Sequence, residues 1–241
     1  MPIDREKVRA IVFDYGNTLI EFTAPQVRAL ETAIGLAIQN VFGPFDLQKY
    51  IDIRRRDYRS PYSHPELRES TIPGMFEATV WELYSRRATP AQIESLIAVH
   101  DEHFVKLIDA PDYLDALLSN LHRRYRLALV SNYPCGRSIR GSLQRTGIAR
   151  HMDAIVISGE VGYVKPHPLP FQTVVEQLGV GPGEIVFVGD NWLGDVQGAK
   201  RLGMYAVHTL QFDTLEVFDR QDGHHDADLT IHHLRELEDH L

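Results

Sequence analysis

Short, uninterrupted apolar runs recur along the chain and are separated by segments in which apolar residues recur every three or four positions. Such runs, rich in Val and Ile, are typical of strands buried on both faces of a sheet. They cover residues 8–13, 125–130, 152–157, 184–189 and 205–210. The spacing between the later runs is that of amphipathic helices. Strands that alternate with helices predict an α/β fold with a doubly wound parallel sheet.

Helical patterns separate the last four predicted strands, and each pattern stops at a glycine. They cover residues 137–147, 170–179 and 193–203. Glycine readily takes the left-handed conformation in which many helices end. A further helical pattern at 110–124 leads into the second strand, and the polar segment 218–228 is predicted to be a surface loop.

The interval between the first two strands is far too long for a single crossover helix. It contains helical patterns at 25–42, 46–60, 74–87 and 90–108. Four amphipathic helices can bury their apolar stripes against one another as a bundle. We therefore predict a helical cap domain at 22–108, inserted into a core domain formed by 1–21 and 109–241.

Polar and charged residues follow the predicted strands at the point where each strand ends. They are Asp14, the pair Ser131 and Asn132, the segment 159–165, and Asp190. In a doubly wound sheet, ligands bind beyond the carboxyl ends of the strands. We therefore expect these residues to gather at one edge of the sheet.

Four segments at these strand ends together resemble the motifs of the haloacid dehalogenase superfamily. They are residues 14–19 (DYGNTL), Ser131 with Asn132, Lys165 in GYVKPHP, and Asp190 with Asp195 in FVGDNWLGD. The resemblance covers residues 8–20 and about 111–208, and segment 227–237 is similar to the family's C-terminal strand and helix. It implies a Rossmann-like core with a helical cap and a Mg²⁺-dependent hydrolase, and we expect a phosphatase that acts on a small phosphorylated metabolite.

The residue types at these positions suit phosphoryl transfer. The Asp14 carboxylate can attack phosphorus and form an acyl phosphate that water then hydrolyses. Mg²⁺ held by Asp14, Asp190 and Asp195 would neutralise the approaching anions. Lys165 supplies a fixed positive charge, and the Ser131 hydroxyl can bind phosphoryl oxygens. We assign Asp14, Lys165 and Ser131 to catalysis.

The resemblance implies further binding residues. It makes the main-chain carbonyl of Gly16 a metal ligand beside Asp14, Asp190 and Asp195. The residues expected to bind substrate are Asn17, Ser131, Asn132 and Lys165.

Gly16 departs from the family pattern, because phosphatases of this family usually carry an aspartate there that protonates the leaving group. Loss of a general acid typically costs about 10²–10⁴ in rate. Three explanations stay open: a leaving group that needs little protonation (acyl, aryl or anomeric phosphates), replacement by water or by a cap residue such as Tyr62 or His64, or phosphate binding with slow turnover.

Two alternatives to a phosphatase remain. A 2-haloacid dehalogenase also lacks the second acid, but it uses no metal, and Asp190 and Asp195 would then be unfavourable neighbours of Asp14. The other alternative is a non-catalytic phosphate-binding or regulatory protein on the same fold.

Composition narrows the possible partners and cellular location of the protein. The 241 residues carry a formal net charge of −8, which argues against nucleic acid as a partner. Cys135 is the single cysteine, so the chain forms no internal disulfide. The charged N-terminus does not resemble a leader, and no apolar run approaches the ~20 residues of a membrane span. We expect a cytoplasmic monomer or homodimer.

Overall fold

The computed structural model describes residues 3–212 and 226–241 and contains a parallel sheet of six strands, which confirms the predicted α/β doubly wound class. The strand order across the sheet is β3-β2-β1-β4-β5-β6. The strands are β1 (Ala10–Phe13), β2 (Arg126–Ser131), β3 (Ala154–Ile157), β4 (Ile185–Gly189), β5 (Tyr205–Thr209) and β6 (Leu229–Ile231). Strand β6 lies in the segment expected to hold a C-terminal strand and helix.

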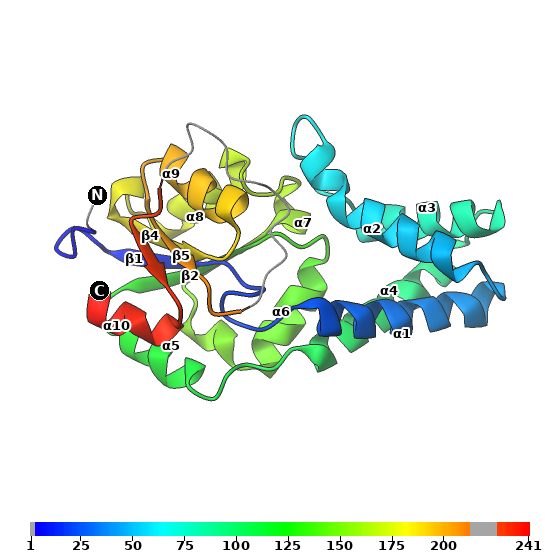
Figure 1. Ribbon diagram of the computed structural model, residues 1–241, viewed down its shortest axis with the longest axis horizontal. Coiled ribbons are helices and arrows are strands. Elements are labelled where there is room, and N and C mark those ends of the chain that lie inside the picture. Colours follow the sequence, from blue (N-terminus) through cyan, green and yellow to red (C-terminus); the bar gives the residue numbers. More distant parts are fainter. Residues whose placement is uncertain (1–2, 213–225) are drawn as a thin grey trace.

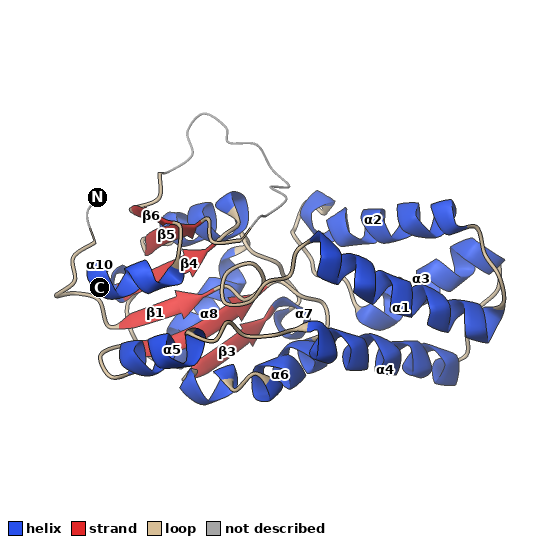
Figure 2. Ribbon diagram, turned by 60° about the horizontal axis from the view of Figure 1, so that its bottom comes forward, coloured by secondary structure: helices blue, strands red, loops and turns tan. Residues whose placement is uncertain are grey.

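Helices cover both faces of the sheet, because alternate strand side chains enter two separate apolar cores (Figure 2). From β1, Ile11 and Phe13 enter one core and Ala10 and Val12 enter the other. The first core packs against α5 (Leu114–His122), α6 (Gly136–Arg145), η1 (Ile148–His151), η4 (Leu234–Glu236) and α10 (Leu237–His240). The second packs against α8 (Pro168–Leu178) and α9 (Gly198–Arg201). Short helices α7 (Ser158–Val161) and η2 (Pro182–Glu184) adjoin β3 and β4.

Four longer helices lie between β1 and α5 in the chain and extend together to one side of the sheet (Figure 1). They are α1 (Ala24–Phe42), α2 (Leu47–Ser63), α3 (Ile72–Tyr84) and α4 (Pro90–Leu107). Their buried side chains, such as Ile34, Phe76 and Phe104, form one continuous core with the side chains beneath α5 and α6. The helical region is therefore anchored to one face of the sheet.

Capping residues explain where these helices begin. At α4, Thr89 Oγ1 accepts a hydrogen bond from Gln92 N at 3.3 Å, and Gln92 Oε1 accepts one from Thr89 N at 2.9 Å. This reciprocal pair satisfies two backbone donors that have no partner within the helix. At α2, the Asp46 side chain accepts from Lys49 N.

Two helices differ from the sequence prediction. Helix α2 was expected to end at residue 60, before Pro61, but it continues through Pro61 to Ser63. The helix predicted over 193–203 instead begins as a six-residue π-helix, η3 (Trp192–Gln197), and then continues as α9. π-Helical turns occur frequently at functional sites.

Part of the predicted surface loop at 218–228, up to residue 225, lies outside the described residues. Among the described helices, none is sufficiently long and apolar to cross a bilayer.

Candidate active site

Asp14 follows the central strand of the sheet, and its backbone is fixed by the neighbouring strand. Strand β1 lies between β2 and β4, and Phe13 pairs with Leu129 and Val188. Asp14 N donates a hydrogen bond to Val188 O at 2.9 Å. Because the three strands are parallel, the residues that follow β2 and β4 emerge at the same edge as Asp14.

Three carboxylates converge at this edge. One carboxylate oxygen each from Asp14, Asp190 and Asp195 lies within 4.8 Å of the other two. Lys165 Nζ lies 2.6 Å from Asp14 Oδ1 and 2.7 Å from Asp195 Oδ1, and it donates to Val130 O at 2.7 Å. Lys165 and Asp195 are almost fully buried. The structure therefore brings together the four charged residues singled out in the sequence.

The site holds more negative than positive charge. Burial raises the pKa of Asp190 well above its usual value, and the charges of Asp14 and Asp195 add to this shift. Burial likewise raises the pKa of Asp195 to about 6, although Lys165 opposes the shift. Burial would lower the pKa of Lys165, but Asp14 and Asp195 outweigh it and raise that pKa. One ammonium thus faces three carboxyl groups, an arrangement that a divalent cation would stabilise.

Asn132 holds the loop that carries Lys165. Its Oδ1 accepts a hydrogen bond from Lys165 N at 2.8 Å, and its Nδ2 donates to Lys165 O at 3.0 Å. The Asn132 side chain therefore positions Lys165, and its predicted contact with substrate stays a prediction. Ser131 is buried at the end of β2, and Ser131, Asn132 and Asn17 all line the cavity above the carboxylates.

Close packing fixes Asp195. Asn191 N donates to Asp195 Oδ2 at 2.9 Å, and Asn191 Oδ1 accepts from Gly194 N at 2.6 Å. A Cβ added at Gly189 would lie 2.3 Å from Asp195 Oδ2. A glycine is therefore required at the end of β4 for this carboxylate to approach the strand.

The backbone does not require glycine at position 16. An added Cβ would lie 3.6 Å from Phe22 Cβ, an ordinary van der Waals contact. The left-handed residue in this turn is Asn17, with φ of 57°, and its Oδ1 accepts from Phe22 N at 2.9 Å. The absence of an acid at position 16 is consequently a chemical feature of the site and not a demand of the turn.

Thr18 belongs to the site and received no role from the sequence. Its Oγ1 lies 3.3 Å from Asp14 Oδ2 and 3.4 Å from Asp190 Oδ1. The residue is fully buried, so its hydroxyl links the two carboxylates. The only indication of this role in the sequence was that Thr18 lies four residues after Asp14. Threonine is common in turns, so this position alone did not predict a site residue.

Helix α2 supplies one of the two residues considered as replacements for the missing acid. Tyr62 lines the cavity, and its hydroxyl accepts a hydrogen bond from Asn132 Nδ2 at 3.3 Å. Burial raises the pKa of Tyr62, so the hydroxyl stays protonated at neutral pH. His64 is exposed, and Glu66 N donates to its Nδ1. It does not line the cavity formed by the described residues.

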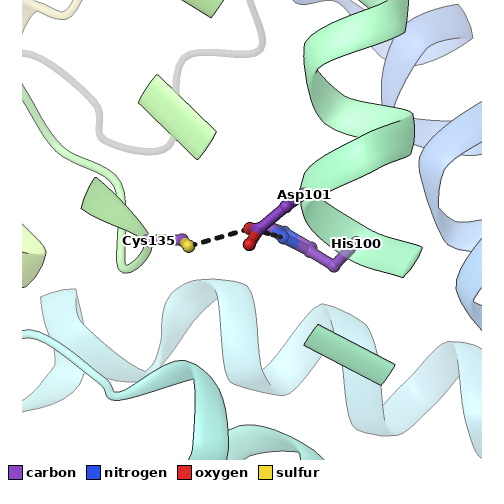
Figure 3. Close-up of side chains that lie close together, drawn as sticks. All are labelled: His100, Asp101 and Cys135. Atoms are coloured by element: carbon purple, nitrogen blue, oxygen red, sulfur yellow. Dashed lines mark hydrogen bonds and ion pairs between the residues drawn. The ribbon is translucent and has the colours of Figure 1, made fainter. Parts of the chain in front are cut away.

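A second polar cluster joins α4 to the loop after β2 (Figure 3). Asp101 Oδ1 lies 3.3 Å from His100 Nδ1 and accepts a hydrogen bond from Cys135 Sγ at 3.1 Å. Ser138 and Arg137 also donate to Asp101. Burial raises the pKa of the Cys135 thiol, which keeps the proton that it donates to Asp101. The cluster thus works as a hydrogen-bonded junction between α4 and α6.

Sequence comparison identifies the family to which this arrangement belongs. A model of the haloacid dehalogenase-like hydrolases matches residues 8–203, which is most of the chain and includes all four motifs. The chain belongs to the haloacid dehalogenase-like hydrolase family. The family resemblance derived from the motifs is thereby confirmed.

Proteins similar to this chain include both kinds of enzyme considered in the sequence analysis. A glyceraldehyde 3-phosphate phosphatase of Methanopyrus kandleri is 26% identical over 221 residues, 89% of each chain. A 2-haloacid dehalogenase of Pseudomonas syringae shares the fold with a TM-score of 0.72 at 20% identity, over 96% of this chain and 97% of that chain. A phosphatase of Thermococcus onnurineus has a TM-score of 0.65 at 23% identity, with the same coverage.

Proposed function

We propose that this family member is a Mg²⁺-dependent phosphatase of small phosphorylated metabolites that works through an aspartyl phosphate on Asp14. The observation that carries the proposal is the cluster of Asp14, Asp190 and Asp195 around Lys165. The phosphatase named among the relatives supports the same reaction class.

The donor set fits Mg²⁺. This ion prefers oxygen ligands and is commonly held by one or two carboxylates together with substrate phosphate. Asp14, Asp190 and Asp195 offer carboxylate oxygens close enough to share one ion, and the Gly16 carbonyl is proposed as a further ligand. When bound, Mg²⁺ would neutralise carboxylate charge and polarise a phosphoryl oxygen.

The chain's own residues carry the covalent steps. An Asp14 oxygen attacks phosphorus, the bond from phosphorus to the leaving oxygen breaks, and its electron pair departs with that oxygen, which then takes a proton from water. A second water attacks the aspartyl phosphate, releases inorganic phosphate and restores the Asp14 carboxylate. Lys165 and the Ser131 hydroxyl stabilise the phosphoryl oxygens.

Helices α1 to α4 are proposed as a cap domain, residues 22–108, over a core formed by 1–21 and 109–241. The cavity above Asp14 includes Phe22, Tyr58 and Tyr62 from this region or its border. Such a cover would exclude water and select the substrate. A cytoplasmic monomer or homodimer remains part of the proposal.

A substrate panel with and without Mg²⁺ tests the proposal. We expect purified protein to hydrolyse acetyl phosphate and a set of phosphate monoesters only when Mg²⁺ is present, and to leave 2-chloropropionate intact. Metal-independent halide release would favour the dehalogenase. Absence of turnover together with Mg²⁺-dependent phosphate binding would favour the non-catalytic alternative.

A further inference from the structure

A second cavity adjoins the carboxylate site and lies against α1, α2 and α3. Phe22, Tyr58, Tyr62, Asn132 and Tyr133 line both cavities, so a molecule whose phosphate lies at Asp14 can extend directly into the second cavity. The volume of this cavity is about 100 Å³, room for several water molecules.

Most of its wall is apolar or aromatic. Beyond the aromatic residues at the junction, the apolar part of the wall includes Leu30, Pro61, Ile72 and Met75. Phe22 and Tyr133 are oriented edge to face, with ring centroids 6.4 Å apart. Aromatic walls of this kind favour an apolar ring, which they can contact by offset or edge-on packing.

The charged residues of the wall carry an excess of acid. Arg54 forms a two-point ion pair with Glu31, with Nε to Oε2 at 2.9 Å and Nη2 to Oε1 at 3.2 Å, and its Nη1 lies 3.4 Å from Asp57 Oδ2. Arg54 is about nine-tenths buried and lies over the Phe76 ring. The wall also includes Glu69, whose pKa burial raises.

This pairing leaves no uncommitted arginine or lysine among the described residues that line the second cavity. A carboxylate or second phosphate there would lose water and meet Glu31, Asp57 and Glu69 without a compensating cation. His100 also reaches the wall, but its ring nitrogens already contact Tyr133 and Asp101.

The missing acid at position 16 also favours an aromatic leaving group. A phenolic oxygen becomes a stable anion near pH 10 and departs without prior protonation far more readily than an alkoxide. An aryl ester therefore meets both conditions: its ring fits the aromatic wall and its leaving oxygen needs no general acid.

We infer that the second cavity binds the leaving group of the substrate and that the substrates are phosphate monoesters of uncharged phenols. This inference rests on the proposed phosphatase function. The reaction converts the aryl phosphate and water into the phenol and inorganic phosphate; the phenolate carries away the electron pair of the broken phosphorus–oxygen bond and takes its proton from water.

A matched substrate series tests this inference. We expect phenyl phosphate to have a kcat/KM at least tenfold above that of 4-carboxyphenyl phosphate, which adds one anionic group to the same ring. Inhibition by benzylphosphonate, 4-carboxybenzylphosphonate and propylphosphonate measures binding apart from chemistry, and benzylphosphonate should bind at least tenfold more tightly than the other two.

Variants of the ion pair between Arg54 and Glu31 test whether the charged wall of the second cavity causes this substrate preference. Glu31→Gln removes a negative charge and releases Arg54 from its two-point ion pair, so we expect the preference for phenyl over 4-carboxyphenyl phosphate to fall about tenfold. Asp57→Asn should also lower the preference for phenyl phosphate, and it replaces Glu31→Gln in the test if that variant folds poorly. Asp52 is exposed on α2, the helix that carries Arg54 and Asp57, so Asp52→Asn should leave the ratio of the two kcat/KM values unchanged.

The two proposals fail in different ways. Hydrolysis of acetyl phosphate with equal or better use of carboxylated, cationic or short alkyl phosphates would overturn the inference about the second cavity and leave the phosphatase proposal intact. Loss of all phosphatase activity, acetyl phosphate included, would overturn the phosphatase proposal itself. A preference for phenyl phosphate that neither Glu31→Gln nor Asp57→Asn changes would also overturn the role assigned to this wall.

Discussion

Asn132 and Lys165 are joined by two reciprocal hydrogen bonds, from Lys165 N to Asn132 Oδ1 and from Asn132 Nδ2 to Lys165 O. The first residue follows β2 and the second follows β3, so one side chain joins two loops of the proposed active site. The ammonium of Lys165 then reaches Asp14 and Asp195 from a fixed backbone. This relationship makes Asn132 a positioning residue.

Asn132→Ala removes both hydrogen bonds and allows Lys165 to shift relative to Asp14. Small displacements of catalytic groups can cost up to about 10²-fold in rate, so we expect kcat to fall by roughly tenfold to a hundredfold. Steady-state kinetics on acetyl phosphate measure this, with the exposed Asn120→Ala as control. A change confined to KM would instead indicate that Asn132 contacts substrate directly.

Asp14→Asn should remove the nucleophile and leave the fold intact, because the amide keeps the size of the carboxylate and relieves repulsion from Asp190 and Asp195. Removal of a nucleophile commonly costs 10³-fold or more, so we expect no measurable turnover. Phosphate release and circular dichroism check the two halves of the prediction. Retained turnover in a folded variant would refute the aspartyl-phosphate mechanism.

Gly16→Asp should raise activity on alkyl phosphates. The position has room for a side chain and no positive φ, so the variant is expected to fold. A restored general acid is worth about 10²–10⁴ in rate, and even imperfect placement should give roughly tenfold on an alkyl phosphate and little on acetyl phosphate. Gly16→Asn, of similar size but without an acid, is the matched control. Equal gains in both variants would show that proton donation is not what position 16 lacks.

Metal binding should stabilise the protein most at neutral pH. The pKa of Asp195 in the metal-free fold is raised from 3.8 to about 6, so this group favours the folded state when protonated. Its contribution is present below about pH 4 and is lost as pH rises through 6. Mg²⁺ at a hundred times its dissociation constant adds about 2.7 kcal/mol. We therefore expect Mg²⁺ to raise Tm more at pH 7.5 than at pH 5.

Thermal melts of wild type and Asp195→Asn, with Mg²⁺ or EDTA, check this expectation. The variant should show a flatter dependence of Tm on pH without metal and a smaller response to Mg²⁺. Equal Tm shifts at the two pH values in the wild type would contradict it.

Asp101 should contribute stability that depends on pH with the opposite sign. Burial alone would raise its pKa, but hydrogen bonds from His100, Ser138, Cys135 and Arg137 hold that pKa well below 3.8. Its contribution is thus present above about pH 4 and is lost as pH falls further. Asp101→Asn should lower the free energy of unfolding by about 1–3 kcal/mol at pH 7 and by less near pH 3.

Urea denaturation at the two pH values measures this difference, with Asp52→Asn as an exposed control. A loss of stability that is the same at pH 3 and pH 7 would mean that the Asp101 charge does not matter to the junction.

The apolar periodicity predicted the strands and most helix positions, because burial on one or both faces imposes the spacing of apolar residues. The positions of Asp14, Asp190 and Lys165 after predicted strands indicated that they would lie close together, since parallel strands place their carboxyl ends at one edge of the sheet. The π-helix at Asp195 was not predictable in this way, because its sequence follows the same apolar spacing as an ordinary helix.

Other features depend on packing between distant segments. Helix α2 continues past Pro61 even though proline usually follows a helix end, and this extension carries Tyr62 into the cavity. The pairing of Arg54 with Glu31 joins α2 to α1, and a local sequence pattern does not reveal which acid a buried arginine will meet. The sequence therefore indicated the residues of the site better than the lining and charge of the cavity beside it.

The four long helices form one continuous segment of the chain between β1 and β2, and this segment supplies most of the residues that line the second cavity. Asp190, Asp195 and Lys165 all lie outside that segment. Under the proposed function, exchange of this segment between family members would change the accepted leaving group and would keep Asp14, Lys165, Asp190 and Asp195 in place. Substrate specificity could thus change by replacement of this segment alone, without substitution of the residues at the carboxylate site.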